Sequence, residues 1–268
     1  MKFYKILCII LATINVTFAS DTLKIASYNL LNYSGAEISR QAYFRRIIKA
    51  INPDILVSQE MLDSQGVNHF RDSVMNFQQA NSYNYALFHD GFDTDNTLFY
   101  KSSKVSFISA NYVTTTLRDI ADYLVLDLSS GEEIHILSVH LKASIDQESA
   151  RLAEATTLRN YLNNFPANTN FLIVGDFNFY RSTETGFQKL INSEANNNGR
   201  AKDPLNAVGI WNSNASFSSI HTQSPRIRSF GGGSTGGMDD RFDLMLNSYS
   251  LDDNIIISSY TIRNSIIG

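Results

Sequence analysis

The sequence predicts an α/β protein in which mixed β-sheets are covered by helices within one domain. Segments with helical periodicity alternate with short apolar strands in the first part of the chain. Strands joined by short turns follow in the middle, which is typical of antiparallel pairing. The 268 residues are 43% hydrophobic and 18% charged, which is enough apolar material for one large core.

Three elements are expected before residue 60. Residues 23–29 (LKIASYN) alternate as a strand does. Residues 38–51 predict a helix, because apolar side chains recur at i, i+3, i+4 and i+7 from Phe44 onward. Residues 55–58 (ILVS) predict a short buried strand that leads directly to a glutamine and a glutamate.

The middle of the chain predicts mainly strands. A weakly patterned helix is expected first, over residues 66–80. Strands are expected at residues 85–88, 97–100, 105–113, 123–128 and 134–139. Turn residues separate the last three, which therefore suggest an antiparallel run.

The last part of the chain returns to alternating elements. Residues 147–162 predict a helix, and residues 171–175 (FLIVG) predict a buried strand. Residues 192–200 are polar and rich in Asn, and residues 211–240 are rich in Ser and Gly, so both are expected to be loops. Strand patterning resumes at residues 241–246, so the second loop is interpreted as a cover over a site within the same domain.

Residues 1–20 have the features of a secretory signal peptide. Lys2 and Lys5 form a basic start, an apolar run follows, and small residues precede position 20. A membrane anchor is the alternative, but the run is shorter than the roughly 20 residues that a span needs. We expect a secreted protein, extracellular or periplasmic, whose domain covers residues 21–268.

Removal of residues 1–20 also removes Cys8, the only cysteine, so no disulfide is expected. The remaining chain has 20 basic residues against 26 acidic ones. This balance argues against tight nonspecific binding of nucleic acid, which depends on Lys and Arg neutralising phosphates. Transient cleavage of nucleic acid remains compatible with it, and no further segment is long and apolar enough to span a membrane.

The stretch FLIVGDFNFY carries the first candidate site. Asp176 and Asn178 arrive directly after its apolar strand. If the extended backbone continues to Asn178, the two side chains point to the same face. A strand that ends in a polar turn is the alternative, since Asp and Asn are common turn residues.

Other predicted strands also end at, or are interrupted by, acid, amide or imidazole groups. These groups are Asn29, Glu60, His140, the Asp176/Asn178 pair and Asp243. Carboxylates together with amides suit a hard, oxygen-seeking cation, with Mg²⁺ expected and Mn²⁺ or Ca²⁺ as alternatives. Cysteine and histidine clusters with zinc spacing are absent from the sequence.

Five segments taken together resemble a known family. ASYNLLNY, PDILVSQE, LSVHLKAS, IVGDFN and DRFD are similar, in order, to the motifs of the endonuclease/exonuclease/phosphatase superfamily, which has the DNase I-like fold. The resemblance covers residues 23 to 247. It implies a four-layer α/β sandwich of two packed mixed sheets flanked by helices, and hydrolysis of phosphate esters with a divalent metal.

The resemblance also implies roles for individual residues. Glu60 resembles the metal-binding glutamate, and Asn29 the asparagine beside the metal. His140 resembles the histidine that contacts the phosphate. Asp176 resembles the residue that orients or deprotonates the attacking water, and Asn178 the amide that holds a phosphate oxygen.

Three further residues have weaker counterparts. Asp243 resembles the aspartate that fixes the tautomer of a second catalytic histidine. Arg118 matches a phosphate-contacting arginine without a motif around it, and a plain surface charge is the alternative. His221 lies in a loop, where a histidine is more often a surface residue.

The family pattern normally closes with Ser-Asp-His and a last strand, whereas this sequence has no histidine after His221. The sequence therefore predicts a domain that is incomplete at its C-terminus, with the closing strand missing. The strand of Asp243 would then have an exposed edge. Impaired hydrolysis is expected for such a chain.

The favoured function is a secreted, divalent-metal-dependent phosphodiesterase, and in particular a nuclease. The alternatives are a lipid or inositol-phosphate hydrolase of the same family, or a catalytically inactive binding member. The expected partner is nucleic acid or another phosphodiester substrate. The protein is expected to be a monomer.

Overall fold

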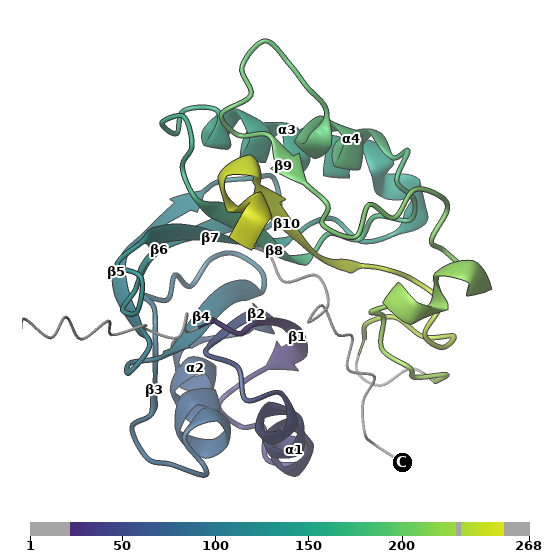
Figure 1. Cartoon of the computed structure of the whole chain (residues 1–268). Coiled ribbons are helices and arrows are strands. Elements are labelled where there is room, and N and C mark those ends of the chain that lie inside the picture. Colours follow the sequence, from purple (N-terminus) through teal and green to yellow (C-terminus); the bar gives the residue numbers. More distant parts are fainter. Residues whose placement is uncertain (1–21, 229–231, 255–268) are drawn as a thin grey trace, which may run out of the picture.

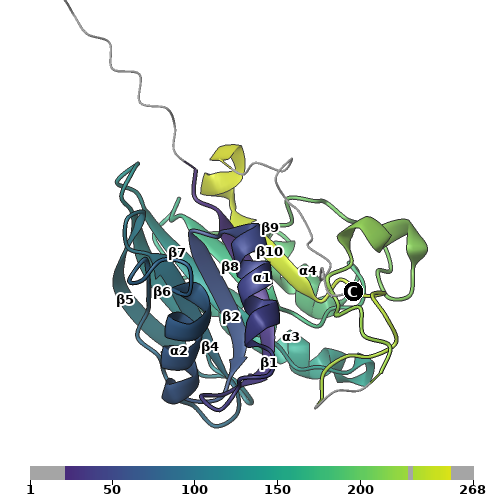
Figure 2. The same cartoon turned by 90° about the horizontal axis from the view of Figure 1, so that it is seen from below.

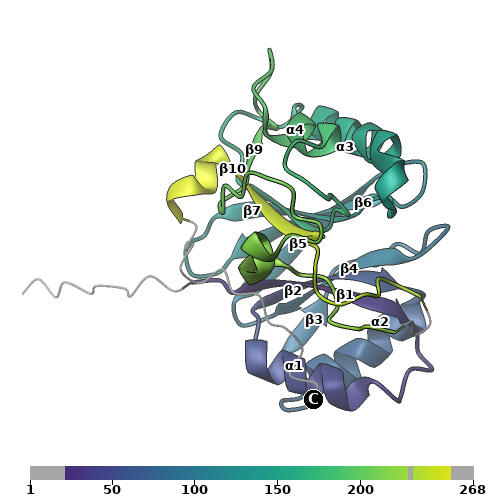
Figure 3. The same cartoon turned by 90° about the vertical axis from the view of Figure 1, so that its right-hand side faces the viewer.

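Two β-sheets pack face to face, and helices cover the outer face of each (Figure 1). The structure is a computed structural model that describes residues 22–228 and 232–254. Turning the molecule shows the same order of layers from below and from the side (Figures 2 and 3). The predicted α/β sandwich of two mixed sheets flanked by helices is therefore confirmed.

The first sheet has four strands in the order β1-β2-β4-β3. Strands β1 and β2 are parallel, because helix α1 connects them, whereas β2–β4 and β3–β4 are antiparallel. Helices α1 and α2 cover the outer face through a cluster that includes Phe44, Phe70 and Phe99. The elements are β1 (Ile25–Tyr33), α1 (Gln41–Ile51), β2 (Ile55–Met61), α2 (Ser64–Phe70), β3 (Tyr83–Tyr85) and β4 (Asp95–Lys101).

The second sheet has six strands in the order β5-β6-β7-β8-β10-β9. Strands β7 and β8 are parallel, with helix α3 as their connection, and the other neighbours are antiparallel. Helices α3 and α4 cover the outer face. The elements are β5 (Val105–Val113), β6 (Ile120–Asp127), β7 (Glu133–His140), α3 (Glu148–Leu162), β8 (Phe171–Asp176), α4 (Thr185–Ile191), β9 (Ala201–Lys202) and β10 (Asp243–Ser248).

Apolar side chains fill most of the space between the sheets. Val57 and Leu98 from the first sheet meet Val125, Ile136 and Val174 from the second. All five are fully buried. Burial of this kind supplies the main free energy that holds the sheets together, at about 25 cal/mol for each Å² of apolar surface removed from water.

Several short elements differ from the prediction. The expected helix at 66–80 is α2 followed by a π-helical turn at Arg71–Met75. Helix α4 and the two-residue strand β9 were not predicted, because neither is long enough to show a period. Three 3-10 helices were also missed: Ile145–Gln147, Ala215–Ile220 and Tyr249–Asn254.

The outer edge of β10 is partly covered. Asn247 and Ser248 pair with Lys202 and Ala201 of β9. At the other end, the Asp243 N–H donates to Thr222 Oγ1 at 2.8 Å. The prediction that this strand lacks a neighbour is therefore wrong for its C-terminal half.

Two predictions fall outside the described residues. The signal peptide at 1–20 precedes them, and the missing closing strand concerns the chain after residue 254. Both stay predictions. None of the helices in the described ranges is long and apolar enough to cross a membrane.

Gly175 sets how closely β8 approaches β7. Its φ is +141°, and a Cβ atom there would overlap the carbonyl oxygen of Val139. Because the carbonyl belongs to one strand backbone and the Cβ would be attached directly to the other, neither can move aside cheaply. The close approach places Val139 beside Gly175 and His140 beside Asp176 in the parallel register.

We expect Gly175→Ala to lower the free energy of unfolding by about 2–5 kcal/mol, through left-handed strain and overpacking together. Gly131→Ala is the matched control, since its φ is +76° but nothing lies within 4 Å of the added Cβ. That control should lose only about 1–2 kcal/mol. Urea unfolding measures both, and equal losses would contradict the role assigned to the close approach.

Candidate active site

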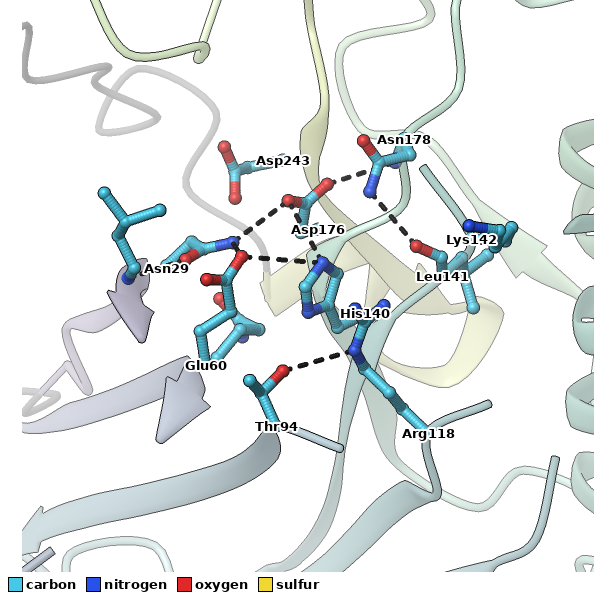
Figure 4. Close-up of polar contacts among 12 residues, drawn as sticks. Asn29, Glu60, Thr94, Arg118, His140, Leu141, Lys142, Asp176, Asn178 and Asp243 are labelled. Atoms are coloured by element: carbon cyan, nitrogen blue, oxygen red, sulfur yellow. Dashed lines mark hydrogen bonds and ion pairs between the residues drawn. The ribbon is translucent and has the colours of Figure 1, made fainter. Parts of the chain in front are cut away.

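Polar side chains from both sheets meet at one end of the sandwich (Figure 4). Asn29 comes from β1, Glu60 from β2, His140 from the end of β7 and Asp176 from the end of β8. Both strand pairs are parallel, so the carboxyl ends within each pair lie together. Asn178, Asp243 and Arg118 lie around this group in the same view.

Asn29 connects the two sheets. Its Nδ2 donates to Glu60 Oε1 at 2.8 Å and to Asp176 Oδ2 at 3.2 Å. Its Oδ1 accepts the backbone N–H of Leu31 at 2.9 Å, which fixes the orientation of the amide. One side chain therefore holds a carboxylate of each sheet at a fixed separation.

Glu60 lies at an irregularity where the strand pairing shifts on both sides of β2. Its φ is +61°, a left-handed conformation that strains a residue other than glycine. The bend turns the carboxylate toward Asn29, and Glu60 Oε2 accepts the Asn32 N–H at 3.1 Å. Backbone strain of this kind is concentrated at functional positions.

His140 faces both acids. Its Nε2 lies 3.8 Å from Glu60 Oε1 and 3.8 Å from Asp176 Oδ2, which is too far for a hydrogen bond. Its Nδ1 is buried and has no hydrogen-bond partner among the described residues. Burial lowers the pKa of His140 to about 3, with a further contribution from the Arg118 guanidinium. The imidazole is therefore neutral at physiological pH.

Asp176 and Asp243 are direct neighbours across β8 and β10. Burial raises the pKa of Asp176 to about 6, and the charge of Glu60 adds to the shift. Burial and the charge of Asp176 raise the pKa of Asp243 well above its usual range. Asp243 Oδ1 is buried without a partner among the described residues. The hydrogen-bond donors of the site therefore do not satisfy all of its carboxylate oxygens.

Asn178 reaches the site by a different route from the one predicted. Strand β8 ends at Asp176, and Asn178 has a left-handed φ of +54°. The condition for a shared face, an extended backbone as far as Asn178, is therefore not met, and the structure has the alternative, a strand that ends in a polar turn. The turn instead lets the Asn178 N–H donate to Asp176 Oδ1 at 3.2 Å, while its Nδ2 donates to the Leu141 carbonyl at 3.1 Å.

Arg118 extends from the connection between β5 and β6 to the side of His140 (Figure 4). Its Nε donates to Thr94 Oγ1 at 3.2 Å, and its Nη2 lies 2.8 Å from Asp93 Oδ2. Its Nη1 is buried without a hydrogen-bond partner in the described part of the chain. The guanidinium is thus fixed on two sides and leaves one nitrogen available beside the imidazole.

His221 takes no part in this group of side chains. It is buried, and its two ring nitrogens lie 2.9 Å from the Trp211 carbonyl and 3.2 Å from the Met238 carbonyl. These contacts hold the loop backbone together. The expectation of a surface loop histidine is therefore wrong with respect to burial.

Sequence reasoning missed Asp93 and Thr94, which hold Arg118. The stretch DGFDTDN that contains them shows no strand alternation, and the strand was expected to begin at Thr97, whereas β4 begins at Asp95. No local pattern indicates that a polar loop residue will contact an arginine 24 positions later. Only the folded chain brings these segments together.

The donor set fits a divalent cation of the Mg²⁺ type. The described residues include no cluster of three or more His, Cys, Asp or Glu side chains placed to hold a metal ion. Mg²⁺ does not need such a cluster, because it keeps several waters and takes only one or two carboxylates. Glu60 and Asp176, both bonded to Asn29, offer two, and the buried Asp243 Oδ1 nearby has no partner among the described residues.

Comparison with known proteins identifies the family. A family model described as Endonuclease/Exonuclease/phosphatase family matches residues 26–259. The chain belongs to this family. Its members are phosphoric ester hydrolases that generally use divalent metal ions. No curated protein matches the sequence.

Solved structures of family members share the fold. A mannosyl-6-phosphatase from Bacteroides thetaiotaomicron has a TM-score of 0.56 and 16% identity, over 85% of this chain and 86% of that one. TDP2 from D. rerio, complexed with a single-strand DNA product, has a TM-score of 0.55 and 16% identity, over 84% and 83%. A β-hairpin deletion mutant of beta toxin from Staphylococcus aureus has a TM-score of 0.55 and 12% identity, over 85% and 88%. At these identities the likeness establishes the fold alone.

Asp95 is a further buried acid beside the segment that holds Arg118. Its Oδ2 accepts the Gly91 N–H at 2.9 Å. Burial raises its pKa to about 6, and the charges of Asp90 and Asp119 add to the shift. The folded state therefore binds a proton at Asp95 more readily than the unfolded state does.

We expect Asp95→Asn to stabilise the protein at neutral pH relative to the wild type. Because the folded pKa lies above the unfolded one, the contribution of Asp95 to stability falls as the pH rises from about 4 to about 6. The asparagine retains the acceptor for Gly91 and does not titrate, so the advantage of the variant should grow across this window. Urea unfolding at several pH values measures the difference. Parallel stability curves for the two proteins would contradict the assignment.

Proposed function

We propose that the protein is a divalent-metal-dependent phosphodiesterase, and specifically a nuclease. One observation carries the proposal: two carboxylates bridged by Asn29 lie beside two nitrogen donors, His140 and Arg118. A phosphodiester bound at this group would be in reach of a cation held by the carboxylates and of the two hydrogen-bond donors. Such an arrangement stabilises the negative charge that develops during hydrolysis.

Asp176 is suited to accept the proton of an attacking water. A general base is most effective when its pKa lies near the working pH, and burial raises the pKa of Asp176 to about 6. Asn29 and the Asn178 N–H each donate to one of its oxygens, so the carboxylate is held in a fixed orientation. The pKa of Asp243, its cross-strand neighbour, is raised by burial and by the charge of Asp176.

His140 and Arg118 are suited to hold the phosphate. The imidazole is neutral, so it can donate from one nitrogen without repelling the neighbouring guanidinium. Arg118 is fixed by Thr94 and Asp93 and has an available Nη1. Two rigid donors fix the orientation of the phosphorus relative to Asp176, which is the main advantage of a preformed site.

Glu60 and Asn29 would hold the cation, with Asp176 as a second carboxylate. When bound, the cation supplies a Lewis acid that stabilises charge on the phosphate oxygens. Glu60 is also held by the Asn32 N–H, so its carboxylate does not have to reorganise. Nucleic acid is the proposed substrate, supported by the likeness in fold to the DNA-complexed TDP2.

We propose in addition that the protein is secreted. The basic start, the apolar run and the small residues of positions 1–20 support this proposal. N-terminal sequencing of the protein recovered outside the cytoplasm of its host tests it. A first residue at position 20 or 21 is expected, and an intact Met1 would contradict secretion by this route.

We expect Asp176→Asn to lower kcat on DNA by about 10²–10⁴-fold, the usual contribution of a general base. Asp127→Asn is the matched control, because Asp127 accepts from Ser129 and Ser130 in a turn away from the site. Plasmid cleavage and hydrolysis of bis(p-nitrophenyl) phosphate measure the effect. Hydrolysis of p-nitrophenyl phosphate alone would show a monoesterase and overturn the proposal, and activity only on phospholipid vesicles would indicate the lipid hydrolase.

We expect Mg²⁺ to raise the melting temperature of the wild type, since it would relieve the repulsion between Glu60 and its neighbours. At a concentration about 100 times Kd the shift should be about 5–10 °C. Glu60→Gln removes the charge and should abolish most of the shift. Scanning fluorimetry at constant ionic strength measures it without any substrate. An equal shift in the variant would place the cation elsewhere.

A further inference from the structure

Asn96 is a buried amide on β4 whose side chain uses both of its ends. Its Oδ1 accepts a hydrogen bond from Ser138 Oγ at 2.9 Å, and its Nδ2 donates to the Asp119 carbonyl at 3.0 Å. Its own carbonyl accepts from the Tyr123 hydroxyl at 2.9 Å. The side chain thus connects the first sheet to two separate parts of the second.

Both side-chain partners are close neighbours of the proposed phosphate-binding residues. Ser138 lies two positions before His140 on β7, so the two side chains point to the same face of the strand. Asp119 directly follows Arg118 in the chain. The Asn96 amide is therefore hydrogen-bonded to a residue two positions before His140 and to the residue directly after Arg118.

The residues before Asn96 act on the same arginine. Asp93 and Thr94 hold the Arg118 guanidinium, at 2.8 Å and 3.2 Å. Asn96 holds the carbonyl of the next residue, Asp119. The segment 93–96 therefore fixes the Arg118 side chain and the main chain of the residue that follows it.

Gln59 extends the connection toward the metal side. This fully buried residue precedes Glu60, and its Nε2 donates to Ser138 Oγ at 3.4 Å, which is a long contact. The Ser138 hydroxyl therefore lies between Gln59 and Asn96. The stronger bond of the two runs to Asn96.

We propose that Asn96 is a positioning residue that sets the placement of His140 relative to Arg118. The expected effect on catalysis rests on the proposed function, whereas the expected effect on the placement of His140 and Arg118 does not. Asn96 contacts neither the site carboxylates nor the phosphate position. It acts through Ser138 on one side and through the Asp119 carbonyl on the other.

Substitutions separate the hydrogen bond to Ser138, on the side of His140, from the hydrogen bond to the Asp119 carbonyl, on the side of Arg118. Asn96→Ala removes both hydrogen bonds, so the buried Ser138 hydroxyl loses its acceptor and the Asp119 carbonyl loses this donor. Asn96→Asp retains an acceptor for Ser138 but turns a carboxylate oxygen toward the Asp119 carbonyl. Ser138→Ala breaks the hydrogen bond toward His140 and the long contact with Gln59, and it leaves the bond to the Asp119 carbonyl intact. Tyr123→Phe is the structural control, since it removes an equally buried hydrogen bond to Asn96 that involves only the backbone carbonyl.

The kinetic test uses the Mg²⁺-loaded protein and bis(p-nitrophenyl) phosphate. We expect Asn96→Ala to lower kcat at least tenfold and to raise KM, because both donors move. Ser138→Ala should lower kcat with little change in KM, and Asn96→Asp should mainly raise KM. Tyr123→Phe should lose stability and retain kcat and KM within twofold. The split between kcat and KM distinguishes positioning from a general loss of folded protein.

A second measurement does not depend on activity. ¹⁵N NMR spectra report the imidazole nitrogens of His140, assigned by their loss in His140→Gln, and the Nε–H of Arg118. Asn96→Ala should shift both sets of signals, Ser138→Ala only those of His140, and Tyr123→Phe neither. If Asn96→Ala does not fold, the Asn96→Asp and Ser138→Ala spectra decide the matter.

Two outcomes would overturn the inference. One is a folded Asn96→Ala protein with wild-type signals for His140 and Arg118. The other is a Tyr123→Phe protein with the same signal shifts and kinetic losses as Asn96→Ala. A wild type that hydrolyses no phosphodiester would instead overturn the proposed function, and the spectra would still decide the role of Asn96.

Discussion

The candidate site depends on one interaction between the two sheets, the hydrogen bonds that Asn29 donates to Glu60 and Asp176. Neither sheet alone carries all of the polar groups. Apolar packing between the sheets is strong but not directional, so it does not define the separation of two carboxylates. A single amide with its Oδ1 fixed by the Leu31 N–H provides that definition. The same hydrogen bonds from Asn29 therefore fix both the orientation of the sheets and the separation of the two carboxylates.

Burial gives the site its electrostatic character. The acids lie on one side, where burial and mutual repulsion raise the pKa of Asp176 and Asp243. His140 and Arg118 lie on the other side, and burial keeps the imidazole neutral. In the proposed function, a cation would compensate the acids, and a phosphate bound beside it would accept from His140 and Arg118.

Short-range patterns predicted mixed sheets covered by helices and the polar residues at the strand ends, whereas the layered packing of two sheets was implied by the family resemblance. Alternation and apolar runs located nearly every strand, and polar residues at strand ends indicated Asn29, Glu60, His140 and Asp176. The left-handed turn at Asn178 was not predictable, since an Asn two residues after a strand end fits an extended or a turned backbone equally well. Thr94 and Asn96 were missed because their partners, Arg118 and Ser138, lie 24 and 42 positions away.

A buried polar connection such as Gln59–Ser138–Asn96 is less favourable for stability than apolar packing, because each group must be desolvated and then satisfied. It nevertheless defines how the two sheets are aligned on each other, because a shift of one sheet by one residue would leave several donors unpaired. It lies between the strands that carry Glu60 and His140, where a fixed alignment matters most for chemistry. An apolar replacement that packs equally well would therefore retain the fold and lose the alignment of its catalytic end. The polar residues between the sheets are thus better explained by the geometry of the site than by the stability of the sandwich.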